Sequence, residues 1–219
     1  MQVVSPGSNL IRGITSTSGV LYVESNDDMI IGPALLVETE STGAKRWDKY
    51  EYVLITKVKG NAITIRRQWN DSPEALAFPV GSYLAPMPWD TRNNDPYVDF
   101  FFNLSDLCPR DEEGKTAMDV LLEEMLYPLA AGGPLENIGG LDLASGPLTV
   151  NPMNADYNVD GIADPDSVYR EGVGTFYERV RAVLGPSRVI TTSPDYEFIG
   201  FINGVNQEGL ANPDDPVSP

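Results

Sequence analysis

The first 90 residues alternate short apolar segments with turn-forming residues. The apolar segments are rich in Val, Ile, Leu and Tyr and are bounded by Gly, Asn, Asp or Pro, which is typical of β-strands. They fall at 20–23, 34–38, 50–58, 62–67 and 81–85. Between the third and fourth lies Lys59-Gly60-Asn61, where Gly and Asn tolerate the positive φ of a tight turn. The pattern therefore predicts an antiparallel hairpin within a small β-barrel-like module.

After a Pro-rich stretch at 86–96 the period of the pattern changes. Residues 98–104 form a continuous apolar run that suits a strand covered on both faces. Apolar residues then recur at spacings of three and four within 118–129 and 167–184, which predicts two amphipathic helices. Further strands are predicted at 188–192 and 198–202. Alternating strands and helices favour a parallel sheet or barrel, so the expected fold class is β followed by α/β.

This pattern predicts a β-rich module at residues 1–90, a partial α/β barrel at 97–209 and a linking or disordered tail at 210–219. A full (β/α)8 barrel takes about 250 residues, more than twice the length of the second segment. We therefore expect the barrel to be incomplete. Open edges of a parallel sheet promote aggregation. We therefore expect that further chain or a partner covers the edges, or that the fold is smaller than a barrel.

Charge is unevenly distributed along the chain. The net charge is −17, of which about −2 falls before Val98 and about −15 from Val98 onward. Nucleic-acid binding depends on clustered Lys and Arg, and the only basic doublets are Lys45-Arg46 and Arg66-Arg67. The composition thus argues against nucleic-acid binding and favours a solvated acidic surface, with cation binding as the alternative.

No apolar stretch approaches the roughly 20 residues that a membrane-spanning helix needs. Residues 1–13 also lack the basic flank and apolar run of a secretory signal peptide. We therefore expect neither a transmembrane segment nor export by that route.

The chain contains no histidine and one cysteine, Cys108. The absence of histidine excludes Ser-His-Asp and Cys-His nucleophiles, His-ligated zinc and histidine general bases. Any catalysis must therefore use carboxylates. A single cysteine cannot form an internal disulfide, so Cys108 is predicted to be a buried structural thiol.

One acidic motif has the spacing of a calcium-binding loop. Oxygen-bearing side chains occupy its first, third, fifth and ninth positions, and Gly161 at the sixth permits the sharp turn around Ca²⁺. The candidate ligands are Asp156, Asn158, Asp160 and Asp164. Ser167 replaces the bidentate Glu of the twelfth position, so a polar turn before a helix, with Asp166 or Ser167 as N-cap, is the alternative. A metal bound here would be structural rather than catalytic.

A strand ending in a carboxylate, the hairpin EYVLITKVKGNAITIRRQW and the segment ALAFPVGSYL follow one another in the first half of the chain. In this order they resemble a small β module that recurs in phage virion proteins, where it precedes or links other domains. The resemblance covers about residues 18–87 and implies that residues 1–90 attach the chain to other virion proteins. It includes no catalytic signature, and an unrelated small β-barrel is the alternative.

The segments FFFNLSDLCPRDEEGKT and DYNVDGIADPDSVYREGVGTFYERVRAVLGPSRVITT, with 138–145 and 201–209, resemble a family of glycoside hydrolase-like TIM-barrel proteins. The resemblance matches an acidic loop at Asp156, Asp160, Gly161 and Asp164 and a later strand at Asn203, Gly204 and Glu208. Gly139 and Ala144 stand where the family pattern D-G-I-x-x-D has its acids. The resemblance therefore leaves Asp142 and Glu208 as the candidate catalytic pair for a reaction that generally needs two carboxylates.

These features lead to two functional hypotheses. The favoured one is a structural component of a phage tail, fibre or baseplate, oligomeric within the virion, whose glycosidase-like segment is inactive. The alternative is an active glycoside hydrolase that cleaves host surface polysaccharide. A third class, a cellular carbohydrate-binding or secreted enzyme domain, is weakened by the missing signal peptide.

Overall fold

The computed structural model describes residues 2–69, 72, 74–90, 99–142, 155–192 and 200–205. The chain divides into two compact units. The first, here the β-rich unit, comprises 1–103, 107–117 and 150–166, and the second, the α/β unit, comprises 104–106, 118–149 and 167–219. The acidic motif thus groups with the β-rich unit although it lies far along the chain, and the division predicted at 90–97 stays a prediction.

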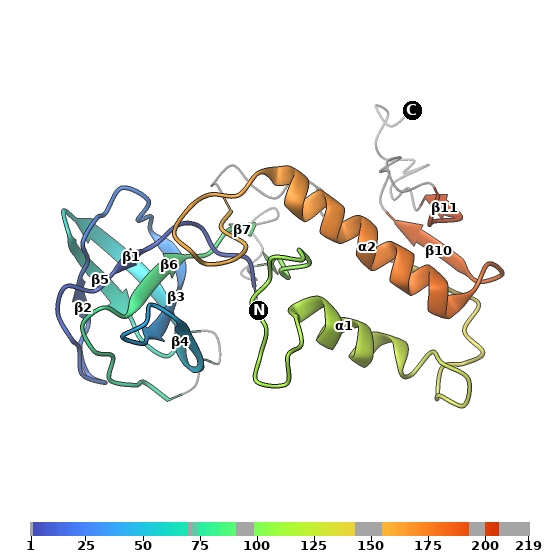
Figure 1. Ribbon diagram of the computed structural model, residues 1–219, viewed down its shortest axis with the longest axis horizontal. Helices are drawn as coiled ribbons and strands as arrows, with labels where there is room; N and C mark the ends of the chain where they lie inside the picture. The colour runs from blue at the N-terminus through green and yellow to red at the C-terminus, as the bar shows by residue number, and fades with distance from the viewer. Residues whose placement is uncertain are drawn as a thin grey trace, which may run out of the picture. The chain divides into compact units, whose positions relative to one another are not determined.

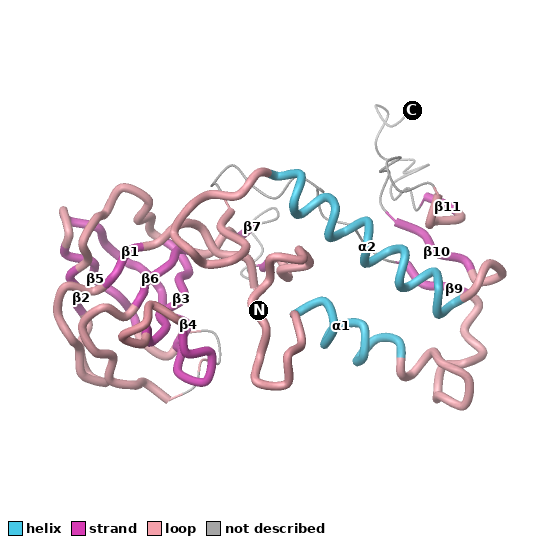
Figure 2. Tube along the Cα trace, in the orientation of Figure 1, coloured by secondary structure: helices cyan, strands magenta, loops and turns pink. Residues whose placement is uncertain are grey.

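A curled six-stranded sheet forms the β-rich unit (Figures 1 and 2). In spatial order its strands are β1 (Ser8–Asn9), β6 (Tyr83–Pro86), β3 (Gly32–Thr39), β4 (Lys45–Lys59), β5 (Ala62–Arg66) and β2 (Val20–Tyr22). Every neighbouring pair is antiparallel. The predicted hairpin is confirmed as β4 and β5, which meet at Gly60 with a φ of 54°. A β-rich fold for this part of the chain is therefore correct.

The two end strands of this sheet meet each other. An isolated bridge joins Leu10 to Val23, directly beyond β1 and β2. The Ile11 amide donates to the Tyr22 carbonyl at 2.9 Å, and the Glu24 amide donates to the Asn9 carbonyl at 3.0 Å. Bulges at Val37/Glu38 and between Ile55 and Lys57 accompany the curl, since a bulge increases local strand twist.

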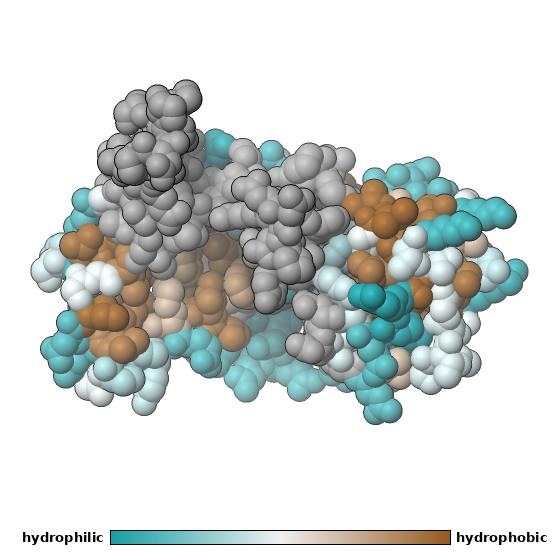
Figure 3. Space-filling view, turned by 180° about the vertical axis from the view of Figure 1, so that it is seen from behind, coloured by the Kyte–Doolittle hydropathy of each residue, from teal (hydrophilic) through white to brown (hydrophobic). Residues whose placement is uncertain are grey.

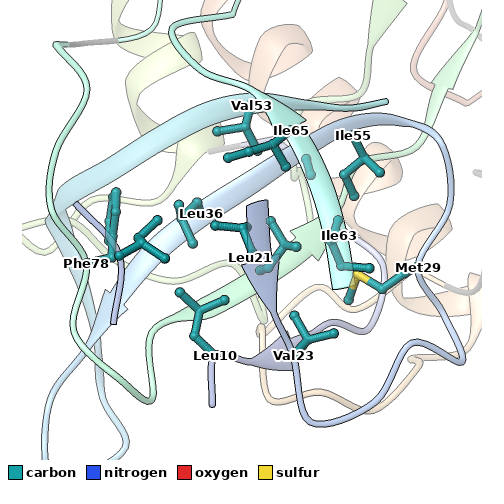
Figure 4. Close-up of a cluster of buried hydrophobic side chains, with 13 residues drawn as sticks. Leu10, Leu21, Val23, Met29, Leu36, Val53, Ile55, Ile63, Ile65 and Phe78 are labelled. Carbon is teal, nitrogen blue, oxygen red and sulfur yellow. The ribbon is translucent and has the colours of Figure 1, made fainter. Parts of the chain in front are cut away.

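The concave side of the sheet encloses the main hydrophobic core. Successive side chains of a strand point to opposite faces, so Val53 and Ile55 of β4 join Ile63 and Ile65 of β5 inside. Figure 4 shows side chains from several strands converging on this space. The other buried members are Leu10, Ile14, Leu21, Val23, Met29, Ala34, Leu36, Phe78 and Leu84.

The opposite face of β3 and β6 is buried as well. Its apolar residues are Leu35, Val37, Tyr83, Ala85 and Met87. Val4, from the N-terminal segment, and Val159, from the acidic motif, complete this second cluster. Two segments distant in sequence therefore cover one outer face of the sheet, which explains why β3 is buried on both sides.

An ion pair lies at one end of the main core. Glu51 has no exposed surface, and the guanidinium of Arg67 contacts its carboxylate through Nε, at 2.8 Å, and through Nη2. The Gln68 amide also donates to Glu51, at 2.9 Å. Arg67 donates further to the carbonyls of Thr15, at 2.9 Å, and Leu76, at 2.6 Å. One buried ion pair thereby holds together the connection between β1 and β2 and the connection between β5 and β6.

The α/β unit contains helices α1 (Ala117–Leu126) and α2 (Asp166–Leu184) and a parallel sheet of β9 (Gly140–Asp142), β10 (Val189–Thr192) and β11 (Gly204–Val205). Both predicted helices and the strand predicted at 188–192 are confirmed. Gly172 of α2 lies against the Leu104 backbone, where a Cβ would come within 2.2 Å of the carbonyl oxygen. The apolar stripe of α2 is buried, as its periodicity predicts.

Two strand predictions are wrong. Of the run 98–104 the structure describes 99–104, and within these residues only Asp99–Phe100 forms a strand, β8, which pairs antiparallel with β7 (Trp89–Asp90) instead of entering a parallel sheet. Phe102 is 52% exposed, so the run is not covered on both faces. The strand predicted at 198–202 lies partly outside the described residues, and the described strand begins later, at Gly204.

The parallel strands do not close into a barrel within the described part of the chain. Neither described helix has the length and apolar character needed to cross a bilayer. Cys108 is buried, as predicted for the single cysteine of the chain.

We expect Arg67→Met to destabilise the β-rich unit by about 3–5 kcal/mol, because it leaves the buried Glu51 carboxylate without a counter-charge. The double variant Glu51→Leu with Arg67→Met should lose less, since it removes both charges together. Urea unfolding of the single and double variants measures both values. Additive losses would show that the two side chains act independently.

Candidate functional site

The acidic loop, defined as residues 155–164, brings the four predicted metal ligands together on the outer face of the β-rich unit. The Asp156 amide donates to the Val4 carbonyl at 2.8 Å, which fastens the loop to the N-terminal segment. The Asp164 amide donates to the Ala155 carbonyl at 2.7 Å and closes the loop at its base. Val159 at its tip is buried in the outer cluster.

The carboxylates of this loop accept hydrogen bonds from its own backbone. Asp156 Oδ1 accepts from the Asp160 amide at 3.1 Å, and its Oδ2 accepts from the Gly161 amide at 2.8 Å. Asp164 Oδ2 accepts from the Tyr157 amide at 2.8 Å. Asp156 is fully buried, so these bonds replace the water that its carboxylate loses.

Asn158 and Asp160 continue this pattern at the exposed end of the loop. The Asp160 amide donates to Asn158 Oδ1 at 3.0 Å, and Asn158 Nδ2 donates to Asp160 Oδ2 at the same distance. Asp160 Oδ1 accepts from the Ile162 amide at 2.8 Å. The resulting tight turn requires positive φ at Val159, 60°, and at Gly161, 95°.

Val159 is a residue that the sequence did not single out. A β-branched side chain at positive φ is rare and costs of order 1–3 kcal/mol. Burial of the Val159 side chain against Tyr83 and its neighbours offsets that cost. One sequence signal could have indicated this packing. Val159 is an apolar residue between two candidate calcium ligands, Asn158 and Asp160, at a position where a polar residue would be expected.

Burial raises the pKa of Asp156 to about 6, a change that the neighbouring Asp160 charge adds to and the backbone amides oppose. Lys45 of β4 is the cation that acts on both carboxylates. Burial lowers the pKa of Lys45, while Asp156 and Asp160 raise it. Its Nζ lies 4.3 Å from the centroid of the Tyr83 ring, whose hydroxyl accepts from the Gly7 amide at 2.6 Å.

The loop has the shape of a calcium loop, but its oxygens are engaged by backbone donors. Among the described residues, no group of three or more His, Cys, Asp or Glu is arranged to hold a metal ion. An ammonium group, Lys45, supplies positive charge near the loop instead. Calcium binding by Asp156, Asn158, Asp160 and Asp164 therefore stays a prediction.

The second predicted site falls mostly outside the described residues. Asp142 is the last residue of β9, but its side chain is not among those described, and Glu208 and Ala144 lie outside the described ranges. The register places Asp142 beside Thr191 of β10, which in turn pairs with Gly204 of β11. Asp142 therefore lies at the carboxyl end of its strand, which is the end that carries the active site in (β/α)8 enzymes.

Asn203, another residue of the matched motif, has a positioning role in the fold. Its side-chain Oδ1 accepts from the Ile190 amide at 3.0 Å and from Arg181 of α2. Its own amide donates to the Ile190 carbonyl at 2.9 Å. Asn203 therefore fixes the start of β11 beside β10 and ties both strands to α2.

No protein-family model matches this chain. A comparison with curated proteins gives no match either.

We expect the stabilising contribution of the Asp156 carboxyl to be complete below about pH 4 and to be lost as the pH rises to about 6. The reason is that the folded chain favours the protonated form, and a pKa near 6 against an ordinary value of 3.8 corresponds to up to about 3 kcal/mol. Urea unfolding at several pH values, wild type against Asp156→Asn, measures this difference.

Asp48→Asn is the matched control for that comparison. A hydrogen bond from Arg46 lowers the pKa of Asp48, so its contribution is present at neutral pH and is lost as the pH falls. A difference between wild type and Asp156→Asn that stays constant from pH 4 to 6 would contradict the prediction.

We expect the acidic loop to bind Ca²⁺ weakly, if at all. Ser167 lacks the bidentate carboxylate of the twelfth position, and both oxygens of Asp156 already accept backbone hydrogen bonds. Titration calorimetry with the full chain tests this. A submicromolar site that disappears in Asp160→Ala would show that other oxygens complete the coordination shell.

Proposed function

We propose that this chain is a structural component of a phage virion, in the tail, fibre or baseplate, and that its glycosidase-like segment is inactive. The observation that supports this best is the self-sufficiency of the β-rich unit, which carries the resemblance to virion attachment modules. The unit has its own core, joined end strands and a covered outer face over β3 and β6. A unit of this kind can hold its shape while it is bound to a neighbouring protein.

The acidic loop adds to this support. Through the Val4 hydrogen bond and the Val159 packing it anchors a later part of the chain on the β-rich unit. In a particle, a chain held at two points of one rigid unit resists being pulled away from it. The partners of this unit would be other virion proteins, with a surface glycan as a further ligand.

The alternative function, an active glycoside hydrolase, is favoured by one observation. Asp142 ends β9 in a parallel sheet whose strands are adjacent in chain order, as they are in (β/α) barrels. Glu208 follows β11 by three residues in the sequence. The resemblance, however, expects an acid where Ala144 stands, and one missing carboxylate removes either the proton donor or the nucleophile or base.

Mass spectrometry of purified phage particles tests the structural proposal. We expect peptides of this chain in stoichiometric amounts, with cross-links to other virion proteins concentrated in residues 1–90. Particles that lack the chain, or cross-links confined to the α/β unit, would contradict the proposal.

We expect no release of sugars from host surface polysaccharide by the purified chain. Positioned acid-base catalysis typically supplies about 10²- to 10⁴-fold in rate, and the site lacks one of its two groups. The assay compares wild type with Asp142→Asn and Glu208→Gln, and Ala144→Asp serves as the variant that restores the missing acid. Sugar release by wild type that both substitutions abolish would establish the alternative function.

A further inference from the structure

A second part of the outer face of the sheet, over β2, β5 and β4, combines apolar and basic side chains. The strand register aligns residues in lateral rows, and side chains in one row point to the same face. The two rows are Tyr22–Ala62–Lys59 and Val20–Thr64–Lys57. We call this surface, together with Ile11, Arg12 and Arg66, the basic face.

Large apolar side chains of the basic face are open to solvent. Val20 is 42% exposed, Tyr22 37% and Ile11 46%. Ile11 adjoins Tyr22 through the backbone hydrogen bond that joins the ends of the sheet. Figure 3 shows that apolar side chains reach the surface of the β-rich unit among hydrophilic ones. Such exposed apolar groups bordered by polar ones are typical of interaction surfaces.

The charge of this face is opposite to that of the protein. Arg12, Lys57, Lys59 and Arg66 are exposed, and among the described residues none of them takes part in an ion pair. The two rows contain no Asp or Glu. In a chain of net charge −17, this local excess of positive charge favours an acidic partner.

A surface with the complementary composition occurs on α1. Val120 and Tyr127 are 42% and 78% exposed, and Glu123 and Glu124 between them are exposed as well. Spacings of three and four place Val120, Glu123 and Glu124 on one side of the helix, and Tyr127 follows directly after its last residue, with its amide donating to the Glu123 carbonyl at 3.1 Å. We call these four residues the acidic face. No Lys or Arg occurs from Ala117 to Asp142, and the ion pair that the structure gives to α1 joins Arg179 of α2 to Asp119, outside these four residues.

We propose that the basic face of one copy of this chain binds the acidic face of a second copy. Charge is complementary between the faces, and each also offers one aromatic and one or more aliphatic side chains for the centre of a contact. Because two different surfaces meet, the contact can repeat from copy to copy. The inference rests on the proposed function for its biological context, a particle built from repeated copies. It is tested on the purified chain.

Nucleic acid and anionic lipid would also be attracted by basic charge, but they do not account for the second surface. A matching acidic and apolar helix face within the same sequence is explained by self-association.

Sedimentation velocity of the full chain tests the proposal. We expect concentration-dependent association below about 1 mM chain. At least a tenfold weakening should follow when NaCl is raised from about 50 to about 500 mM, because exposed charges are screened. Lys57→Glu with Lys59→Glu, and separately Glu123→Lys with Glu124→Lys, should each abolish association. An equimolar mixture of the two variants should restore it, since the reversed faces are again complementary.

Lys49→Glu with Lys115→Glu is the matched control for the Lys57 and Lys59 reversal, because it lowers the net charge by the same amount outside both faces. It should associate like wild type, with circular dichroism confirming the fold of every variant. Four outcomes would overturn the proposal: a monomer at all concentrations, association unaffected by either reversal, no complex in the mixture, or preferential binding of wild type to anionic vesicles or duplex DNA. If self-association fails but the chain is detected in purified phage particles, only the self-association proposal is contradicted.

Discussion

The β-rich unit depends on one buried charge being fully paired. The Glu51 carboxylate has no contact with solvent, and Arg67 and the Gln68 amide donate hydrogen bonds to it. Since the same guanidinium also binds carbonyls at Thr15 and Leu76, the pair fixes where the β1–β2 and β5–β6 connections lie. An apolar pair of similar volume could fill the same space, but it would not specify these backbone positions. The ion pair thus fixes specific backbone positions in a unit whose core is otherwise apolar.

The outer face shows a different solution to burial. β3 is apolar on both sides, so half of its surface must be covered by something other than the sheet's own concave core. The N-terminal segment and the acidic loop provide this cover, and the loop does so with a strained Val159 and a buried Asp156. A motif that in isolation suggests metal binding therefore also has a packing role, with its carboxylates used to hold the backbone turn.

The elements that could be predicted from the sequence are those whose signal is local. The β4–β5 hairpin follows from alternation around Gly60, and α2 follows from its apolar stripe. The pairing of Leu10 with Val23 and the docking of Asp156 on Val4 could not be predicted, because they join segments whose contact leaves no periodic pattern. The run of Phe residues near 101 gave a wrong prediction of a strand covered on both faces. Hydrophobicity alone does not show whether a strand enters a parallel sheet. At the candidate catalytic site, the strand end at Asp142 was foreseen through the resemblance, while the anchoring role of Asn203 required the structure.

The bridge between Val4 and Asp156 has a consequence for biosynthesis. About 70 residues separate the end of β6 from Asp156, and ribosomes add about 5–20 residues per second, so the strands of the sheet are complete roughly 4–14 seconds before the loop emerges. During that interval Leu35, Val37 and the other apolar groups of the outer face lack the part of their cover that the acidic loop provides. The nascent unit therefore presents a temporary hydrophobic surface, and this interval is when a chaperone or a neighbouring nascent chain could bind it.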